Sequence, residues 1–162
     1  MQKNLIFILT ALLTLVSCAQ PKSAEESHIY IISTNDMHAN IEATPRLATL
    51  VKEYETKGEV VLVDSGDRVT GNAYVDDDAE PGIPMIELMN AVGYDVVTLG
   101  NHEFDKGRDA LYAMVDASEF EWVCSNMSDA EGVGLKPYVT IDVEDVDITF
   151  VGTVATDFNG RP

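Results

Sequence analysis

Hydrophobic and polar positions along the chain fall into two patterns that alternate. Four short runs are almost continuously apolar or rich in β-branched residues, which predicts strands buried on both faces. These runs cover residues 28–34, 59–64, 95–100 and 121–126. Three stretches carry apolar side chains at helical spacing and predict helices: residues 45–55, 83–92 and 106–117. Residues 138–155 predict two more strands, joined by a turn at 144–147.

This order of elements predicts the fold class. Strands that alternate with helices, and that are apolar throughout, favour an α/β fold with a parallel sheet flanked by helices. The final pair of strands predicts that antiparallel strands extend this sheet. No helix is predicted beyond Phe158, so we expect the sheet core to be incomplete at the C-terminal end.

The N-terminus has the pattern of an export signal. Lys3 precedes an apolar run at 5–16, which is too short to span a bilayer as a stable helix. Small residues then lead to Cys18, and this segment resembles a bacterial lipoprotein signal with its lipobox. We expect residues 1–17 to be cleaved, Cys18 to be lipidated and residues 18–27 to form a tether. The protein would be a membrane-anchored lipoprotein of the cell envelope, in the periplasm or at the cell surface. The alternative is an ordinary secretory signal with an incidental cysteine.

Composition and residue spacing argue against three features: nucleic-acid binding, an intramolecular disulfide and a calcium-binding EF-hand loop. Asp and Glu number 28 against 10 Lys and Arg, and a net charge of −18 repels nucleic-acid backbones, so we expect no nucleic-acid partner. After Cys18 only Cys124 remains, so no intramolecular disulfide is expected in the mature chain. Residues 76–87 have acids at the positions of a calcium-binding EF-hand loop, but Pro81 stands where that loop needs glycine.

Candidate ligands follow the predicted strands. Ligands of open α/β sheets bind beyond the carboxyl ends of the strands. Asp36 and His38 follow the first strand, and in extended backbone these two residues would project to the same side. Asp64 and Asp67 end and follow the second strand, and an Asp67 carboxylate could bridge two metals while Gly66 permits a tight turn. Such loops at one edge predict a metal centre.

The loop after the third strand is dense in polar groups. Asn101 offers a carbonyl oxygen to a second metal, and His102, next in sequence, is expected to point toward a substrate. Asp105 could hold the His102 imidazole in one orientation and favour its protonated form. Asn126 follows the fourth strand.

The motifs NDMHAN at 35–40, DSGDRVTGN at 64–72 and GNHEFD at 100–105 resemble the first three metal motifs of the calcineurin-like metallophosphoesterases. They are similar to those of the 5'-nucleotidase and UDP-sugar hydrolase branch. The resemblance covers about residues 29–158. It implies that residues 28–162 are the N-terminal portion of a metallophosphoesterase sandwich, a β-sheet core flanked by helices.

The resemblance implies a metal site for two divalent ions, manganese, zinc or similar. Asp36 and His38 would bind the first ion, Asn101 the second, and Asp67 would bridge both. The metals would polarise the phosphate of a nucleotide or another phosphate ester and lower the pKa of a bound water that attacks phosphorus in line. The resemblance gives His102 and Asp105 the role of a catalytic pair that stabilises the transferring phosphoryl group and the leaving oxygen.

The family also carries features that this sequence does not show. It completes its metal site with GH and GHxH motifs, whereas this chain has three histidines, and His28 opens the first strand at its far end. We therefore expect an incomplete second metal site, a missing C-terminal nucleotide-binding domain, and a truncated chain that hydrolyses phosphate esters poorly or not at all. The alternative is a non-catalytic surface lipoprotein that keeps the fold as a binding module. Retention of all the candidate ligands favours the enzyme.

Overall fold

The structure is a computed structural model that describes residues 27–128 and 131–155. The predicted signal, Cys18 and most of the tether lie outside these residues. A four-stranded sheet with the order β1-β2-β3-β4 forms the centre, and all its pairings are parallel, as predicted. Its strands are β1 (Ile29–Thr34), β2 (Glu59–Asp64), β3 (Val96–Thr98) and β4 (Glu121–Val123).

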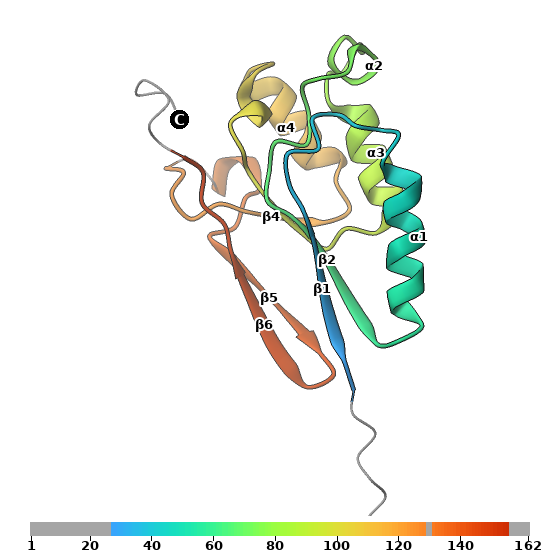
Figure 1. Ribbon diagram of the computed structural model, residues 1–162. Helices are drawn as coiled ribbons and strands as arrows, with labels where there is room; N and C mark the ends of the chain where they lie inside the picture. Colours follow the sequence, from blue (N-terminus) through green and yellow to red (C-terminus); the bar gives the residue numbers. More distant parts are fainter. Residues whose placement is uncertain (1–26, 129–130, 156–162) are drawn as a thin grey trace, which may run out of the picture.

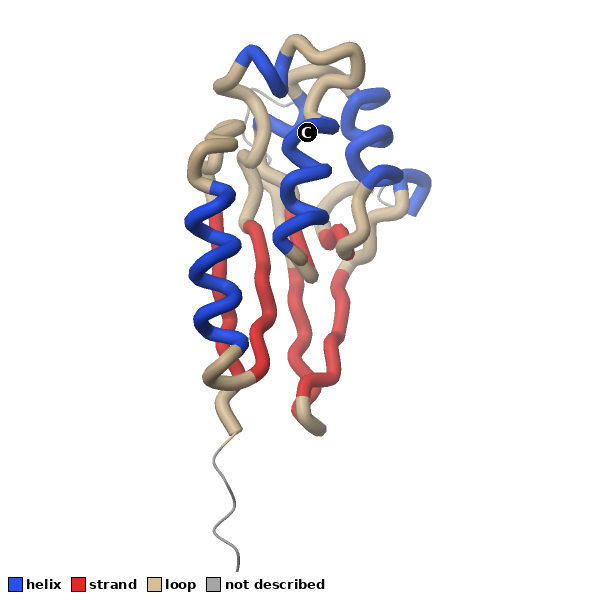
Figure 2. The backbone as a smooth tube through the Cα atoms, turned by 90° about the vertical axis from the view of Figure 1, so that its right-hand side faces the viewer, coloured by secondary structure: helices blue, strands red, loops and turns tan. Residues whose placement is uncertain are grey.

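Three helices cover one face of this sheet, as Figures 1 and 2 show. They are α1 (Thr44–Glu55), α3 (Ile83–Val92) and α4 (Arg108–Ala117). Proline in the first turn begins α1 and α3, where its missing N–H costs no hydrogen bond. Gly93, at a φ of 90°, ends α3 in a left-handed conformation that favours glycine. The three predicted helices are confirmed.

The core lies between the sheet and these helices. Leu62 and Trp122 from the strands pack with Ile86 and Leu111 from the helices, and each of these side chains is at most 2% exposed. Burial of such apolar surface is the main stabilising contribution to the fold. Among residues 27–128 and 131–155, no helix combines the length and the apolar character needed to cross a membrane.

Three short elements were not predicted. They are α2 (Ala73–Asp76) and the 3₁₀ turns η1 (His102–Phe104) and η2 (Glu131–Val133). A single helical turn is too short to show a repeating apolar period, so the sequence pattern carries no signal for it. Two of them, α2 and η1, form part of the candidate site.

The last two strands, β5 (Tyr138–Val143) and β6 (Val146–Val151), form the predicted antiparallel hairpin. The prediction that they extend the first sheet is wrong, because they form a separate two-stranded sheet. On the side of β4 away from β3, Val123 forms an isolated bridge with Lys136, before β5 begins. After β6, the carbonyl oxygen of Gly152 accepts from Ser125 N at 2.8 Å. The alternation of half-buried and exposed side chains along both strands indicates that the hairpin packs through one apolar face. In Figure 1 it lies on the opposite side of β1 and β2 from α1.

Candidate metal centre

The loops after β1, β2 and β3 meet at the carboxyl edge of the sheet, near α2 in Figure 1. The first two loops are joined by backbone hydrogen bonds. The N–H groups of Asp36 and His38 donate to the carbonyl oxygens of Gly66 and Asp67 at 3.0 and 2.9 Å. The predicted convergence of these loops is therefore confirmed.

Two glycines bring the second and third loops into backbone contact. A Cβ on Gly66, which has a φ of 105°, would lie 2.3 Å from the nitrogen of Gly100. A Cβ on Gly100 would lie 2.1 Å from the Oδ1 atom of Asp67. Only residues without side chains permit this approach. The tight turn predicted at Gly66 is confirmed. It places Asp67 in contact with the loop that carries His102.

Three side chains from these loops converge on one point. One ligand atom each from His38, Asp67 and His102 lies within 4.8 Å of the others, close enough to hold one metal ion. The two imidazole rings meet edge to face, with their centroids 4.8 Å apart. The backbone N–H of His102 also donates to Asp67 Oδ1 at 2.9 Å. The structure places the His102 ring beside His38, and its expected orientation toward a substrate stays a prediction.

The orientation of His38 is fixed by a backbone carbonyl. Its Nδ1 atom lies 3.0 Å from the carbonyl oxygen of Thr70. A carbonyl oxygen can only accept, so Nδ1 carries the proton, and the Nε2 atom of a neutral ring keeps its lone pair for a metal. Nε2 lies 3.8 Å from Oδ1 of Asp36, so these two candidate ligands face the same region.

The extended backbone expected from Asp36 to His38 is wrong. Asp36, His38 and Ala39 have φ angles of 50°, 46° and 54°, in the left-handed region. Consecutive N–H groups, those of His38 and Ala39, both donate to the second loop, at 2.9 and 2.8 Å. An extended strand could not make both bonds, because its successive N–H groups point to opposite sides. The side chains converge through the turn rather than through strand geometry.

His102 and Asp105 form the predicted pair. His102 Nδ1 lies 2.7 Å from Asp105 Oδ2. This hydrogen bond is the largest influence that raises the pKa of His102, and partial burial opposes it. Burial of Asp105 acts to raise its pKa, but the hydrogen bond and the charge of His102 outweigh burial, so the pKa of Asp105 is lowered.

This pair predicts a pH dependence of stability. The pKa of His102 is higher in the folded chain than in the unfolded chain, where it is about 6.5. His102 therefore contributes its full stabilisation below about pH 6.5, and this contribution is lost as the pH rises through the folded-state pKa. The lowered pKa of Asp105 gives a contribution that is present above about pH 4 and lost as the pH falls through its folded pKa. The pair therefore contributes most between about pH 4 and 6.5. Asp105→Asn should lower the pKa of His102 in an NMR titration of the ring protons. An unchanged His102 pKa would contradict the pairing.

Residues 29–154 match the family model for calcineurin-like phosphoesterases. The chain belongs to this family. It is 34% identical over 158 residues to the trifunctional nucleotide phosphoesterase protein YfkN of Bacillus subtilis, which covers 79% of this chain and 11% of that protein. It is 31% identical over 153 residues to the 2',3'-cyclic-nucleotide 2'-phosphodiesterase/3'-nucleotidase of Haemophilus influenzae, covering 80% of this chain and 23% of that protein.

The fold agrees with solved structures. The crystal structure of a 5'-nucleotidase precursor from Thermus thermophilus superposes with a TM-score of 0.70 and 23% sequence identity, over 78% of this chain and 28% of that one. The likeness confirms the α/β phosphoesterase fold. This phosphoesterase chain spans less than a third of the length of each of these relatives.

The phosphoesterase site has a buried carboxylate that sequence reasoning missed. Glu103 is 1% exposed, and its carboxylate accepts backbone N–H groups of Asp67 at 3.0 Å, Arg68 at 3.0 Å and Gly100 at 2.5 Å. It therefore ties the loop that carries Asp67 to the loop that carries His102. Nothing in the local pattern separates Glu103 from a solvated loop residue, because two of its partners lie about thirty-five positions earlier in the chain.

Asp64 does not contribute to the metal centre. It is buried and pairs with Arg68, whose Nη2 and Nε atoms lie 2.9 and 3.0 Å from Asp64 Oδ1. The Thr34 hydroxyl donates to its other oxygen at 2.6 Å. With its oxygens used within the fold, Asp64 supports the loop that follows β2.

Of the two candidate asparagines, Asn126 makes side-chain hydrogen bonds within the fold. Asn126 holds Val154 through two hydrogen bonds, with Val154 N donating to Oδ1 at 2.9 Å and Nδ2 donating to Val154 O at 2.7 Å. It therefore fastens the chain after β6 to the end of β4. Asn101 lies half-buried at the start of the third loop, and its role as a ligand stays a prediction.

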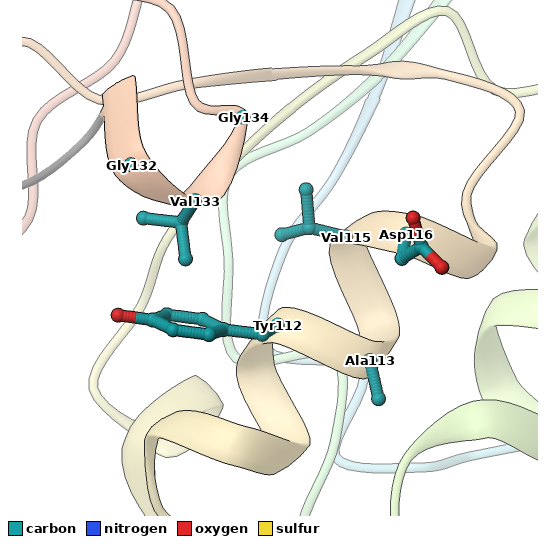
Figure 3. Close-up of a pocket in the computed structure, with 7 residues that line it drawn as sticks. All are labelled: Tyr112, Ala113, Val115, Asp116, Gly132, Val133 and Gly134. Atoms are coloured by element: carbon teal, nitrogen blue, oxygen red, sulfur yellow. The ribbon is translucent and has the colours of Figure 1, made fainter.

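The donor set fits a divalent metal. Imidazole nitrogens and carboxylate oxygens together suit ions such as zinc and manganese, whereas calcium and magnesium prefer oxygen alone. A pocket of about 680 Å³ lies elsewhere, between α4 and η2, where the Tyr112 ring faces Val133 (Figure 3). This pocket includes none of the candidate ligands.

Proposed function

We propose that this chain is the part of a metal-dependent phosphoester hydrolase that holds its first metal ligands, and that the enzyme acts on nucleotides. One observation carries the proposal: at the carboxyl edge of the sheet, ligand atoms of His38 and Asp67 and a ring nitrogen of His102 lie within 4.8 Å of one another. The imidazole that would act on the substrate therefore lies beside two of the proposed metal ligands. The nucleotide substrate is supported by the names of the relatives in Bacillus subtilis and Haemophilus influenzae.

The ligand roles follow from the donors. Asp36 and His38 would hold one divalent ion, Asn101 would serve a second, and Asp67 would lie between them. A bound divalent ion would polarise the phosphate and lower the pKa of a water molecule that binds to it. The chain itself fixes the donors: Thr70 holds His38, and Glu103 holds the backbone of Asp67. Donors held by these hydrogen bonds would orient a phosphate ester with little rearrangement.

His102 and Asp105 would act on the substrate. The hydrogen bond to Asp105 favours the protonated imidazole, which can stabilise negative charge on the phosphoryl group and give a proton to the leaving oxygen. Asp105 accepts from Nδ1 and so orients the ring. The proton moves from His102 to the leaving alkoxide, and solvent replaces it afterwards.

The export prediction complements this function. Cleavage after residue 17, lipidation of Cys18 and a tether over residues 18–27 would place residues 28–162 on a membrane of the bacterial cell envelope. The remaining protein ligands and the nucleotide-binding domain would come from beyond this chain. We therefore expect hydrolysis by this chain to be slow, because it supplies too few ligands for a tight dinuclear site.

The test measures metal binding and hydrolysis in the same samples. Mn²⁺ binding is followed by loss of the free-ion signal in electron paramagnetic resonance, and phosphate release is measured from nucleoside monophosphates. We expect saturable binding and slow hydrolysis that requires the metal, with both reduced at least about tenfold in Asp67→Asn because it removes a charged bridging ligand. Asp147→Asn, on the exposed hairpin, is the charge-matched control.

The outcomes separate the hypotheses. Hydrolysis that persists in Asp67→Asn or without metal would contradict the proposed mechanism. Metal-dependent phosphate release that is lost in Asp67→Asn and kept in Asp147→Asn would favour the enzyme over the non-catalytic binding module.

A further inference from the structure

We propose that Asp76, at the end of α2, is a positioning residue that fixes the tautomer and direction of His38. It would do so through the loop formed by residues 70–72. The inference rests on the proposed function in one respect, namely that His38 binds a metal ion. The contacts that carry it belong to the chain alone.

The Asp76 carboxylate accepts three consecutive backbone N–H groups of this loop. Its Oδ1 atom accepts from Thr70 N at 3.1 Å, and Oδ2 accepts from Gly71 N at 2.8 Å and Asn72 N at 3.0 Å. Both oxygens are therefore engaged with the backbone, so Asp76 is not a metal ligand in this arrangement. Hydrogen bonds to an ionised carboxylate are stronger than those between neutral groups.

The loop needs this support because its backbone is unusual. Thr70 has a φ of 66°, which a β-branched residue rarely adopts, and Gly71 has a φ of 146°. These angles turn the N–H groups of residues 70–72 toward a single carboxylate. Without that negative charge, three converging N–H dipoles would repel one another and the loop would relax toward ordinary angles.

The same loop contacts His38 on two sides. The Thr70 carbonyl accepts the proton of His38 Nδ1 at 3.0 Å. A Cβ on Gly71 would lie 2.6 Å from the carbonyl oxygen of His38 and 3.2 Å from its Cβ. The Thr70 carbonyl cannot move without changing the hydrogen bond that leaves the lone pair of Nε2 directed at the metal centre.

A role for Asp76 in capping α2 does not account for all of these contacts. Asn72 is the N-cap of that helix, and its side chain accepts from Tyr74 N at 3.0 Å. Asp76 lies in the single turn of this four-residue helix, and its bond to the N–H of the N-cap Asn72 does support the helix start. Its bonds to Thr70 N and Gly71 N lie outside the helix, so its carboxylate also supports the loop.

The test observes the tautomer directly, without metal. The chain with ¹⁵N-labelled histidine is studied by long-range ¹H–¹⁵N NMR at about pH 9, where imidazoles are ordinarily neutral. Only three histidines need assignment, and a His28→Gln variant identifies one of them. We expect the proton of His38 on Nδ1 in the wild-type chain, and a shift toward a mixture of both tautomers in Asp76→Asn. The reason is that an asparagine amide has one acceptor oxygen, and its NH₂ group cannot accept, so it cannot replace the carboxylate for all three N–H donors.

The control is Asp77→Asn, which makes the same charge change one residue later. Asp77 contacts Lys106 at 4.0 Å and accepts none of the hydrogen bonds of the 70–72 loop. We expect it to leave the tautomer unchanged. In a parallel Mn²⁺ titration, Asp76→Asn should weaken binding about tenfold, as loss of an outer partner of a ligand does, and Asp77→Asn should not.

Three results would decide the matter. A wild-type His38 with its proton on Nε2 would overturn the inference even where Asp76→Asn fails to fold. A folded Asp76→Asn variant with the wild-type tautomer would overturn it as well. A tautomer shift in Asp76→Asn, in a chain that binds no Mn²⁺, would support the positioning role and contradict the proposed metal function.

Discussion

Asp64→Asn is expected to lower the free energy of unfolding by about 3–5 kcal/mol, because it leaves a buried guanidinium without its counter-ion. Arg68 is fully buried, and its guanidinium lies over the Trp122 ring at 4.4 Å. It also donates to the carbonyl oxygen of Thr98. The guanidinium cannot reach water without disturbing these contacts, so asparagine, which keeps the size of the side chain but not its charge, should be poorly tolerated.

The measurement is urea unfolding followed by circular dichroism. Asp147→Asn, on exposed β6, is the control and should change stability by less than about 0.5 kcal/mol. Combining Asp64→Asn with Arg68→Met removes both charges and should cost less than the two single changes added together, since neither partner is left charged. A loss below about 1 kcal/mol in Asp64→Asn would show that the pair is not a main contributor to stability.

Glu103→Gln is expected to cost about 2–4 kcal/mol of unfolding free energy, because charged hydrogen bonds to buried donors are lost. The carboxylate accepts from three N–H groups, one each in residues 67, 68 and 100. A glutamine amide cannot accept from all three, and its NH₂ group would face one of them. The loop that carries Asp67 and the loop that carries His102 would then separate.

Glu103→Gln should also weaken metal binding in protein that remains folded, which a loss of stability alone would not do. Asp67 loses the support of its backbone, so Mn²⁺ affinity should fall by at least about tenfold in protein that remains folded. Glu119→Gln, at an exposed position, is the control for charge and size. Wild-type Mn²⁺ affinity in folded Glu103→Gln would show that Glu103 supports the fold but does not position Asp67.

Much of the architecture was predictable from the sequence. Apolar runs separated by helical patterns predicted the order of strands and helices, because burial imposes a period on each element separately. The parallel sheet then placed the loops with Asp36, Asp67 and His102 at one edge, since parallel strands present their carboxyl ends together. The pair of His102 and Asp105 was also accessible, because its members lie three residues apart.

The tertiary structure alone decided how those residues are held. Glu103 and Arg68 look like solvated charges in sequence, yet both are buried, because their partners come from loops that are distant in the chain. The left-handed turn at His38 and its bond to Thr70 arise only when the first two loops meet. The sequence thus determined which elements form and which donors share an edge. The contacts between loops determined the tautomer, burial and backbone support of each donor, because a local pattern carries no information about which distant segment completes a hydrogen bond.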